Sequence, residues 1–496
     1  MARAFDTHDL EELRERGIDP AAAERQLELL RHPPRPIALD RPATVGDGIH
    51  QIDAARFHEL ESVAERAASA RRVMTFVPAS GAATRMFKDL RAALDADAPA
   101  QNPAAKLFFE SLDAFPFADD LRRHAGVSGA RTPDEQRRIL RALLDELGYA
   151  ETPKGLIPFH RTAEGTRTPF EEHLLQARRF ARAADGSVRA HFTVAAEHVA
   201  AFERELDRIR PRLESDGARL RVDFSVQEPS TDVLALDPAG EPFRTAEGAL
   251  LFRPSGHGAL LGNLERAGGD LVSIRNIDNV VPDEASADVV RWKKLLVGTL
   301  AEVQREAFAI LEACANDAAG GDLDRGIEIA RARFGRAPAG PLATAEKAAF
   351  VRHALDRPLR VCGVVRNEGE PGGAPFWTVD REGRRSLQIV EASQVDMSDP
   401  AQKAIFASST HFNPVDIAAG MRRWNGDPFE LERFVDADAV VVSKTSYEGR
   451  DLLALERPGL WNGAMAGWNT LFVEVPAPTF APVKTVLDLL RPIHQQ

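Results

Sequence analysis

Hydrophobic residues recur every three or four positions in the first 70 residues, which predicts helices there. From residue 71 the pattern changes to short apolar runs that alternate with helical stretches. Such alternation predicts an α/β fold with a largely parallel sheet flanked by helices. The predicted strands cover 73–77, 188–194, 220–226, 249–253, 271–275, 361–365, 387–391, 438–443 and 470–475.

The pattern also divides the chain into three parts: an N-terminal helical region (1–70), an α/β core (71–355) and a C-terminal part that completes the sheet (356–496). The stretch "TPDEQRRILRALLDELG" predicts a helix without any strand-like run, so we expect a helical insertion over about 90–150. The segments "ANDAAGGDLDRG" and "RFGRAPAGPLA" predict loops that separate the core from the C-terminal part.

Charge and composition exclude several classes of protein. The 496 residues carry a formal net charge of -12 without a basic block, so nucleic acid is not expected as the main partner. No apolar run approaches the length of about 18 residues that a membrane helix needs, and the N-terminus has no apolar core of a signal peptide. The two cysteines are isolated, which fits a reducing compartment. We therefore expect a cytoplasmic protein without a membrane partner.

The stretch "VMTFVPASGAATRMFKDL" predicts a strand, a turn of small residues and a helix that starts at Ala82. It lacks the glycines and the Lys of a Walker A loop, the Gly of a nucleophile elbow, and the three glycines of a dinucleotide fingerprint. A turn with Thr84 and Arg85 in the first helical turn suits the phosphates of a nucleoside triphosphate. The alternative is an ordinary strand–turn–helix with a surface Arg85.

Three further positions carry candidate chemistry. Lys154 follows Pro153, which suits a fixed positive charge directed at phosphates. The Gly-His-Gly sequence at 256–258 follows a strand and opens a helix, so its backbone can lie against a flat ligand. Asp278 comes just after the strand at 271–275, where α/β sheets place ligand-binding residues, and a carboxylate there suits Mg²⁺. The alternatives are an Asx-turn cap for Asp278 and a loop imidazole for His257.

The order of these motifs, followed by "QIVEASQVD" at 388–396 and "FAPVKTVLDLL" at 480–490, resembles the UDP-sugar pyrophosphorylase family. The resemblance covers residues 71–490, with gaps. It implies a Rossmann-like nucleotide-diphospho-sugar transferase fold of the GT-A type with a mixed sheet. In that fold the core at 71–355 binds the nucleotide and performs catalysis, and the part at 356–496 binds the sugar. The loop at 80–85 is poorer in glycine than in the family.

The resemblance implies nucleotidyl transfer from a nucleoside triphosphate, with UTP as the expected one, to a sugar 1-phosphate, with Mg²⁺ as cofactor. Arg85, Lys154 and Lys484 would be catalytic, Asp278 would hold the metal, and Glu391 would accept sugar hydroxyls. The nucleotide would contact Ser80, Gly81, Ala82, Ala83, Gln227, Gly256, His257 and Gly258. We expect a monomer or a small homo-oligomer.

Two other functions stay open at this point. A chain with few loop glycines is compatible with a catalytically inactive regulator that binds nucleotide sugars. A glycosyltransferase on the same fold is the other alternative, but those enzymes typically carry an Asp-x-Asp pair, whereas Asn279 and Val280 follow Asp278.

Overall fold

The computed structural model describes residues 5–316, 320–370 and 372–495. The chain forms two compact units, each assembled from separate segments. Unit 1 contains 1–63, 227–272 and 296–475, and unit 2 contains 64–226, 273–295 and 476–496. The boundaries fall inside α3 (Phe57–Ser69), β11 (Leu271–Arg275) and α11 (Ala287–Ala315). The predicted division of the chain at residues 70 and 355, into a helical region, a nucleotide-binding core and a sugar-binding part, stays a prediction.

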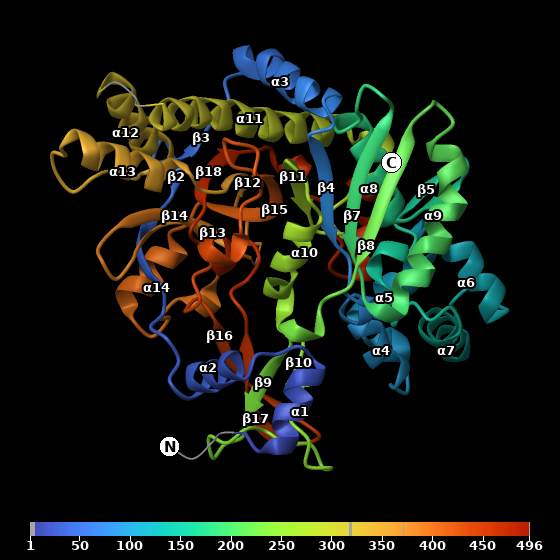
Figure 1. Ribbon diagram of the computed structural model, residues 1–496. Coiled ribbons are helices and arrows are strands. Elements are labelled where there is room, and N and C mark those ends of the chain that lie inside the picture. The colour runs from blue at the N-terminus through green and yellow to red at the C-terminus, as the bar shows by residue number, and fades with distance from the viewer. Residues whose placement is uncertain (1–4, 317–319, 371, 496) are drawn as a thin grey trace. The chain divides into compact units, whose positions relative to one another are not determined.

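Three strands of unit 2 are in parallel register; β4 (Val73–Pro78) and β7 (Ser187–Thr193) are largely buried, whereas most residues of β8 (Arg219–Ser225) are exposed or half-buried. These strands lie side by side (Figure 1), and β11 precedes β4 in the strand order. Helices α8 (Pro169–Phe180) and α9 (Val199–Leu213) pack with β7 and β8 through a cluster of aromatic rings. The rings belong to Phe170, Phe192, Phe202 and Phe224. The hairpin of β5 (His160–Thr162) and β6 (Gly165–Arg167) precedes α8.

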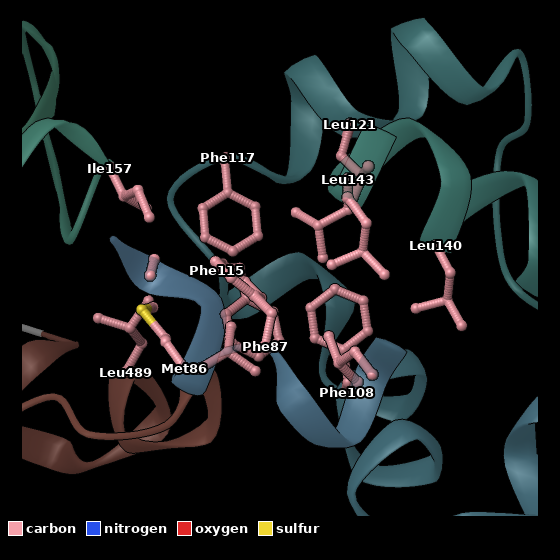
Figure 2. Close-up of a cluster of buried hydrophobic side chains, with 14 of the residues drawn as sticks. Met86, Phe87, Phe108, Phe115, Phe117, Leu121, Leu140, Leu143, Ile157 and Leu489 are labelled. Atoms are coloured by element: carbon pink, nitrogen blue, oxygen red, sulfur yellow. The ribbon is translucent and has the colours of Figure 1, made fainter. Parts of the chain in front are cut away.

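Residues 83–150 of unit 2 are helical, and no strand forms between β4 and β5 in this fully described stretch. The helices are α4 (Lys88–Leu94), α5 (Pro103–Glu110), α6 (Ala118–Ala125) and α7 (Pro133–Arg141), followed by a π-helical turn (Ala142–Glu146). Their apolar faces enclose the buried rings of Phe108, Phe115 and Phe117 (Figure 2). Leu489 from the C-terminal segment lies in the same cluster. We call this set of side chains the insertion core.

The predicted helix start at Ala82 is wrong. Ala83–Arg85 form a 3₁₀ turn, and the α-helix begins only at Lys88. The backbone of Ala82 pairs instead with Pro153 in an isolated β-bridge, which holds this part of the chain extended. A helix as short as α4 offers no strong dipole at this turn, so the helix-terminus argument for anion binding does not apply.

Unit 1 contains a mixed sheet in the strand order β2-β3-β18-β12-β15. Strand β12 (Leu359–Arg366) is parallel to β18 (Asn469–Glu474) and antiparallel to β15 (His411–Gly420). The short strands β2 (Thr44–Val45) and β3 (Gly48–His50) extend the β18 side in parallel. The mixed α/β class is therefore confirmed, and the predicted largely parallel arrangement also holds in this sheet, where β15 is antiparallel to β12 and the other described pairings are parallel.

Two smaller antiparallel sheets complete unit 1. One contains β1 (Ala38–Pro42), β13 (Ala374–Val379) and β14 (Arg385–Val390), and the other has the order β10-β9-β17-β16. These last strands are β9 (Val233–Leu236), β10 (Phe252–Arg253), β16 (Val441–Tyr447) and β17 (Arg450–Glu456). The helices are α1 (Thr7–Glu15), α2 (Pro20–Arg31), α10 (Leu261–Arg266), α12 (Gly320–Phe334), α13 (Thr344–Leu355) and α14 (Pro400–Ala407).

Most of the predicted loop "ANDAAGGDLDRG" is helical. Helix α12 begins at Gly320, and residues 317–319 lie outside the described part of the chain. Gly326 sits in this helix where a Cβ atom would meet Val351 and Ile310 at 2.8–2.9 Å, so it allows α12 to pack closely. None of the described helices is long and apolar enough to cross a bilayer.

Candidate functional site

The small-residue turn after β4 is exposed and open. Ser80, Gly81 and Ala82 are exposed, and a Cβ atom added at Gly81 would meet nothing within 4 Å. Ala83 is buried and donates its backbone N–H to the carbonyl of Thr152 at 3.0 Å. The turn is therefore held at Ala83 and at the carbonyl of Gly81, which accepts the backbone N–H of Lys154 at 3.4 Å, while residues 80–82 remain exposed.

Arg85 is exposed directly after this turn. It forms no hydrogen bond or ion pair with any residue that the structure describes, although most arginines of unit 2 are paired with carboxylates. The neighbouring Thr84 hydroxyl donates to the carbonyl of Ala150 at 3.1 Å, which fixes the backbone next to Arg85. The guanidinium of Arg85 is therefore available to an external anion.

Three of the predicted site residues meet in unit 2. The ammonium group of Lys154 lies 3.0 Å from Asp278 Oδ2, and that of Lys484 lies 3.0 Å from the same oxygen and 3.3 Å from Oδ1. Lys154 also donates to the carbonyl of Val483 at 2.9 Å. We call Lys154, Asp278 and Lys484 the Lys–Asp–Lys cluster.

Local backbone pairing explains why residues so far apart in sequence meet here. The carbonyl of Asp278 accepts from the backbone N–H of Val483 at 3.0 Å, and Asn279 forms a β-bridge with Pro482. The side-chain oxygen of Asn279 accepts from the N–H of Ala481 at 3.0 Å. These bonds hold the segment 481–483 against the turn that follows β11, and they place Lys484 beside Asp278.

Asp488 fixes the chain on the other side of Lys484. Its carboxylate accepts the backbone N–H groups of Lys484 at 2.8 Å and Thr485 at 2.7 Å. Thr485 and Asp488 form a capping box at the start of a 3₁₀ turn. These hydrogen bonds fix the backbone at Lys484, whereas 59% of its side chain is exposed.

The Lys–Asp–Lys cluster carries one net positive charge, because two ammonium groups share one carboxylate. The side chain of Asp278 is only 9% exposed and that of Lys154 only 14%, so water screens their interaction poorly. An anion that approaches from the side of Lys484 meets both ammonium groups. The cluster is therefore chemically suited to bind phosphate.

Asp278 fits one ligand position of a magnesium ion. The described residues contain no group of three or more His, Cys, Asp or Glu side chains arranged to hold a metal. A single carboxylate does not build a resident site, but Mg²⁺ commonly takes one or two carboxylates and completes its shell with water and substrate phosphates. The donor set fits a metal that arrives with a nucleotide.

The Gly-His-Gly sequence lies in unit 1, in a 3₁₀ turn (Gly256–Leu260) that leads into α10. The His257 ring stacks on Trp461 with centroids 4.0 Å apart, and its Nδ1 accepts from the backbone N–H of Leu460 at 2.8 Å. The proton of the neutral ring is therefore on Nε2. Burial lowers the pKa of His257 to about 4, so the ring is a fixed neutral donor near pH 7.

Glu391 and Gln227 also belong to unit 1, and neither contacts His257 in the described structure. The backbone carbonyl of Glu391 accepts the backbone N–H of Gln394 at 3.0 Å, and Gln394 Oε1 accepts the N–H of Glu391 at 3.0 Å. The backbone of Glu391 therefore begins a local 3₁₀ turn. Its predicted contact with a sugar stays a prediction, as does the predicted contact of Gln227 with a base.

Unit 2 contains a second polar group that the sequence did not indicate. His160 Nδ1 lies 2.9 Å from Glu172 Oε1, and His160 Nε2 lies 3.0 Å from His494 Nδ1. All three side chains are buried. Burial lowers the pKa of both imidazoles to about 3 and raises the pKa of Glu172 to about 8. All three groups are therefore uncharged near neutral pH. We call this set the Glu–His–His triad.

The protonated state of Glu172 predicts how stability depends on pH. The folded protein keeps this proton up to about pH 8, whereas an unfolded chain releases it near 4.5. The stability that Glu172 contributes is therefore present below pH 4.5 and is lost as pH rises through 8. The two histidines have the opposite sign, because their contribution is lost as pH falls from 6.5 toward 3.

We expect Glu172→Gln, which imitates the protonated acid, to match the parent at pH 5 and to exceed it in thermal midpoint at pH 9. Scanning calorimetry at the two pH values measures this difference. Glu171→Gln is the matched control, because Glu171 faces Arg167, Arg208 and Arg212 and its loss should destabilise the protein at pH 9. A parent more stable than Glu172→Gln at pH 9 would contradict the assignment.

Several residues of this region were not among the predicted site residues. They are Asn279, Asp488 and the members of the Glu–His–His triad, which form hydrogen bonds with the segments that carry Lys154 or Lys484. Only Asp488 carries a local signal, since Thr485 and Asp488 have the spacing of a capping box. The contact between His160 and His494 spans 334 residues and has no local signature.

The structure is similar to solved structures of nucleotide-sugar enzymes. A mutant of UDP-glucose pyrophosphorylase from Leishmania major, in complex with UDP-glucose, matches with 14% identity and a TM-score of 0.48 over 99% of this chain and 78% of that chain. The UDP-N-acetylglucosamine pyrophosphorylase from Trypanosoma brucei matches with 13% identity and a TM-score of 0.47 over 95% and 74%. No curated protein matches the sequence significantly. A family model described as "Domain of unknown function (DUF4301)" matches residues 6–495, and the chain therefore belongs to this family.

Proposed function

We propose that the chain is a nucleotidyltransferase that joins a nucleoside triphosphate, with UTP as the expected one, to a sugar 1-phosphate and releases pyrophosphate. The observation that carries the proposal is the Lys–Asp–Lys cluster. Its three members lie 124 and 206 residues apart in sequence, yet their charged atoms lie within 3.0–3.3 Å. They are also residues for which the sequence resemblance implied phosphate or metal contacts.

In the proposed reaction an oxygen of the sugar phosphate attacks the α-phosphorus in line. Little covalent help is needed, so the protein contributes position and charge. Lys484, whose side chain is 59% exposed, would neutralise either the phosphate of the sugar 1-phosphate or the α-phosphate of the triphosphate. Lys154, which is fixed by Val483 and Asp278, would hold the leaving pyrophosphate. Arg85 and the open backbone of Ser80 to Ala82 would bind the same leaving group.

Asp278 would hold Mg²⁺ when the ion is bound together with the nucleotide, and the ion would neutralise phosphate charge there. Binding would require Lys484 to leave the carboxylate, because this ammonium group approaches both oxygens. The exposed position of Lys484 permits such a movement. The released ammonium group is then free to meet a phosphate.

The direct test is a turnover assay. Purified protein with Mg²⁺, each of the four common nucleoside triphosphates and a panel of sugar 1-phosphates is expected to release pyrophosphate with at least one pair. If no pair of substrates releases pyrophosphate and the protein binds a nucleotide sugar tightly, the chain is instead the catalytically inactive regulator that binds nucleotide sugars. Hydrolysis or transfer from a nucleotide sugar without pyrophosphate would indicate the glycosyltransferase.

Lys154→Ala is expected to weaken the binding of the triphosphate at least tenfold and to change the binding of the sugar 1-phosphate little, because Lys154 would meet only the leaving group. Isothermal titration with each substrate separately measures both affinities. Lys106→Ala is the matched control, since Lys106 is an exposed lysine of unit 2 that pairs weakly with Glu110 at 3.9 Å. Equal weakening of both substrates would count against the assigned role.

A further inference from the structure

The two lysines of the Lys–Asp–Lys cluster belong to segments that meet a second time. Lys154 and His160 lie in one segment, and Lys484 and His494 lie in the other. The lysines converge on Asp278, and the histidines contact each other directly at 3.0 Å. The segments are therefore joined at both ends.

The histidine contact is specific in geometry. The rings are nearly parallel, with an interplanar angle of 16° and centroids 5.3 Å apart, and one nitrogen faces the other. Glu172 fixes the orientation of the His160 ring through Nδ1 at 2.9 Å. Because all three groups are buried, water cannot replace a lost partner, so a nitrogen left unpaired there is destabilising.

The rest of the C-terminal segment is held mainly by apolar contacts. Val486 and Leu489 pack in the insertion core, and the backbone N–H of Val486 donates to the carbonyl of Met86 at 3.1 Å. Apolar contacts tolerate sliding, whereas a hydrogen bond between two ring nitrogens fixes a register. Beyond Lys484, the triad is thus the buried directional side-chain anchor of this segment, whereas the hydrogen bond of Gln495 to the carbonyl of Ala114 is exposed.

We propose that His160 and His494, oriented by Glu172, are positioning residues that hold Lys484 at the distance from Lys154 which phosphate binding requires. This inference rests on the proposed function. Neither histidine touches a phosphate. The contact between the two rings fixes the segment that carries Lys484. When this contact is lost, the segment shifts and the distance between the ammonium groups of Lys154 and Lys484 increases.

Charged groups surround the triad on each packed element. Arg167 of β6, with Asp283 and Glu284 of the turn before α11, acts on Glu172. Arg167 and Glu284 also act on His160, whereas Arg491 and Asp488 act on His494. Burial, together with the positive charges of Arg167 and Arg491, lowers the pKa of both rings, which keeps them neutral and preserves a single N–H···N bond between them. Protonation of both rings would place two N–H groups opposite each other.

The test compares His494→Phe, which keeps the ring but removes its nitrogens, with His494→Asn, whose amide atoms occupy the position of Nδ1. Titration with inorganic pyrophosphate is expected to show affinity lowered about tenfold for His494→Phe and restored to within threefold for His494→Asn. Hydrogen exchange of peptides within 482–495 should rise for His494→Phe and stay near the parent for His494→Asn.

Gln495→Ala is the matched control. It removes two hydrogen bonds of the same segment, to the carbonyls of Ala114 and Leu489, without touching the triad, and its pyrophosphate affinity should equal that of the parent. Equal affinity of His494→Phe and the parent would overturn the inference. If the parent protein binds no pyrophosphate, the proposed function fails. In that case, unchanged hydrogen exchange of peptides within 482–495 in His494→Phe would separately overturn the positioning role of the histidines.

Discussion

Replacement of Asp278 by Asn is expected to lower the rate of pyrophosphate release at least a hundredfold. The substitution keeps the shape of the side chain but removes the charge on which Lys154 and Lys484 converge. It also removes the carboxylate proposed to hold Mg²⁺. Loss of one preorganised charged partner in a poorly hydrated site costs about 3 kcal/mol in the transition state, which corresponds to this factor in rate. Steady-state kinetics at limiting and saturating Mg²⁺ measure the effect.

Asp283→Asn is the matched control for this prediction. Asp283 lies five residues further along the same connection to α11, where it pairs with Arg179 at 3.2 Å near the surface. Such a pair contributes little, so this variant should keep the parent rate within about twofold. Normal turnover of Asp278→Asn at limiting Mg²⁺ would show that Asp278 serves only as a structural partner of the two lysines.

Phe108→Ala is expected to lower the free energy of unfolding of unit 2 by about 3–5 kcal/mol. The ring of Phe108 is fully buried in the insertion core, and it lies 4.8 Å from the ring of Phe115 (Figure 2). Its removal loses the transfer free energy of the ring and leaves a cavity that helices cannot fill without moving. Urea unfolding gives the loss of stability, and hydrogen exchange of peptides within 86–150 assigns it to this core.

Leu107→Ala provides the comparison in the same helix. Leu107 is 44% exposed on α5, so its truncation should change the free energy of unfolding by no more than about 0.5 kcal/mol. If Phe108→Ala and Leu107→Ala had similar effects, the insertion core would not be the packed unit that the structure describes.

The strands that the sequence predicted well are bounded by turns and buried along nearly their whole length. Strand β11 has the predicted bounds, and β4 extends one residue beyond them. Strand β15 was missed, because Pro414 and Asp416 interrupt its apolar run. The structure accommodates them with a positive φ at Val415 and a register shift opposite Gly363. Such irregularities depend on a neighbouring strand and leave no pattern within one segment.

The candidate site likewise depends on contacts between distant segments, which a pattern within one segment does not reveal. Lys154 and Asp278 were found because each lies next to a local signal, and Lys484 because its motif belongs to the family resemblance; the structure brings the three together. Their partners depend on contacts between distant segments. The helix expected at Ala82 fails for this reason, since the bridge to Pro153, 71 residues later, competes with helix formation. Local propensity does not contain that information.

The discontinuity of unit 2 has a consequence for synthesis on the ribosome. The insertion core is made largely from residues 83–159, yet Val483, Val486 and Leu489 belong to it. These residues emerge more than 300 positions after the phenylalanines that they cover. During translation the phenylalanines of the insertion core therefore stay incompletely covered, exposed or bound to a chaperone, until the C-terminal segment has been synthesised. The segment that closes this core also delivers Lys484, so a nascent chain acquires its complete charged cluster only when unit 2 finishes folding.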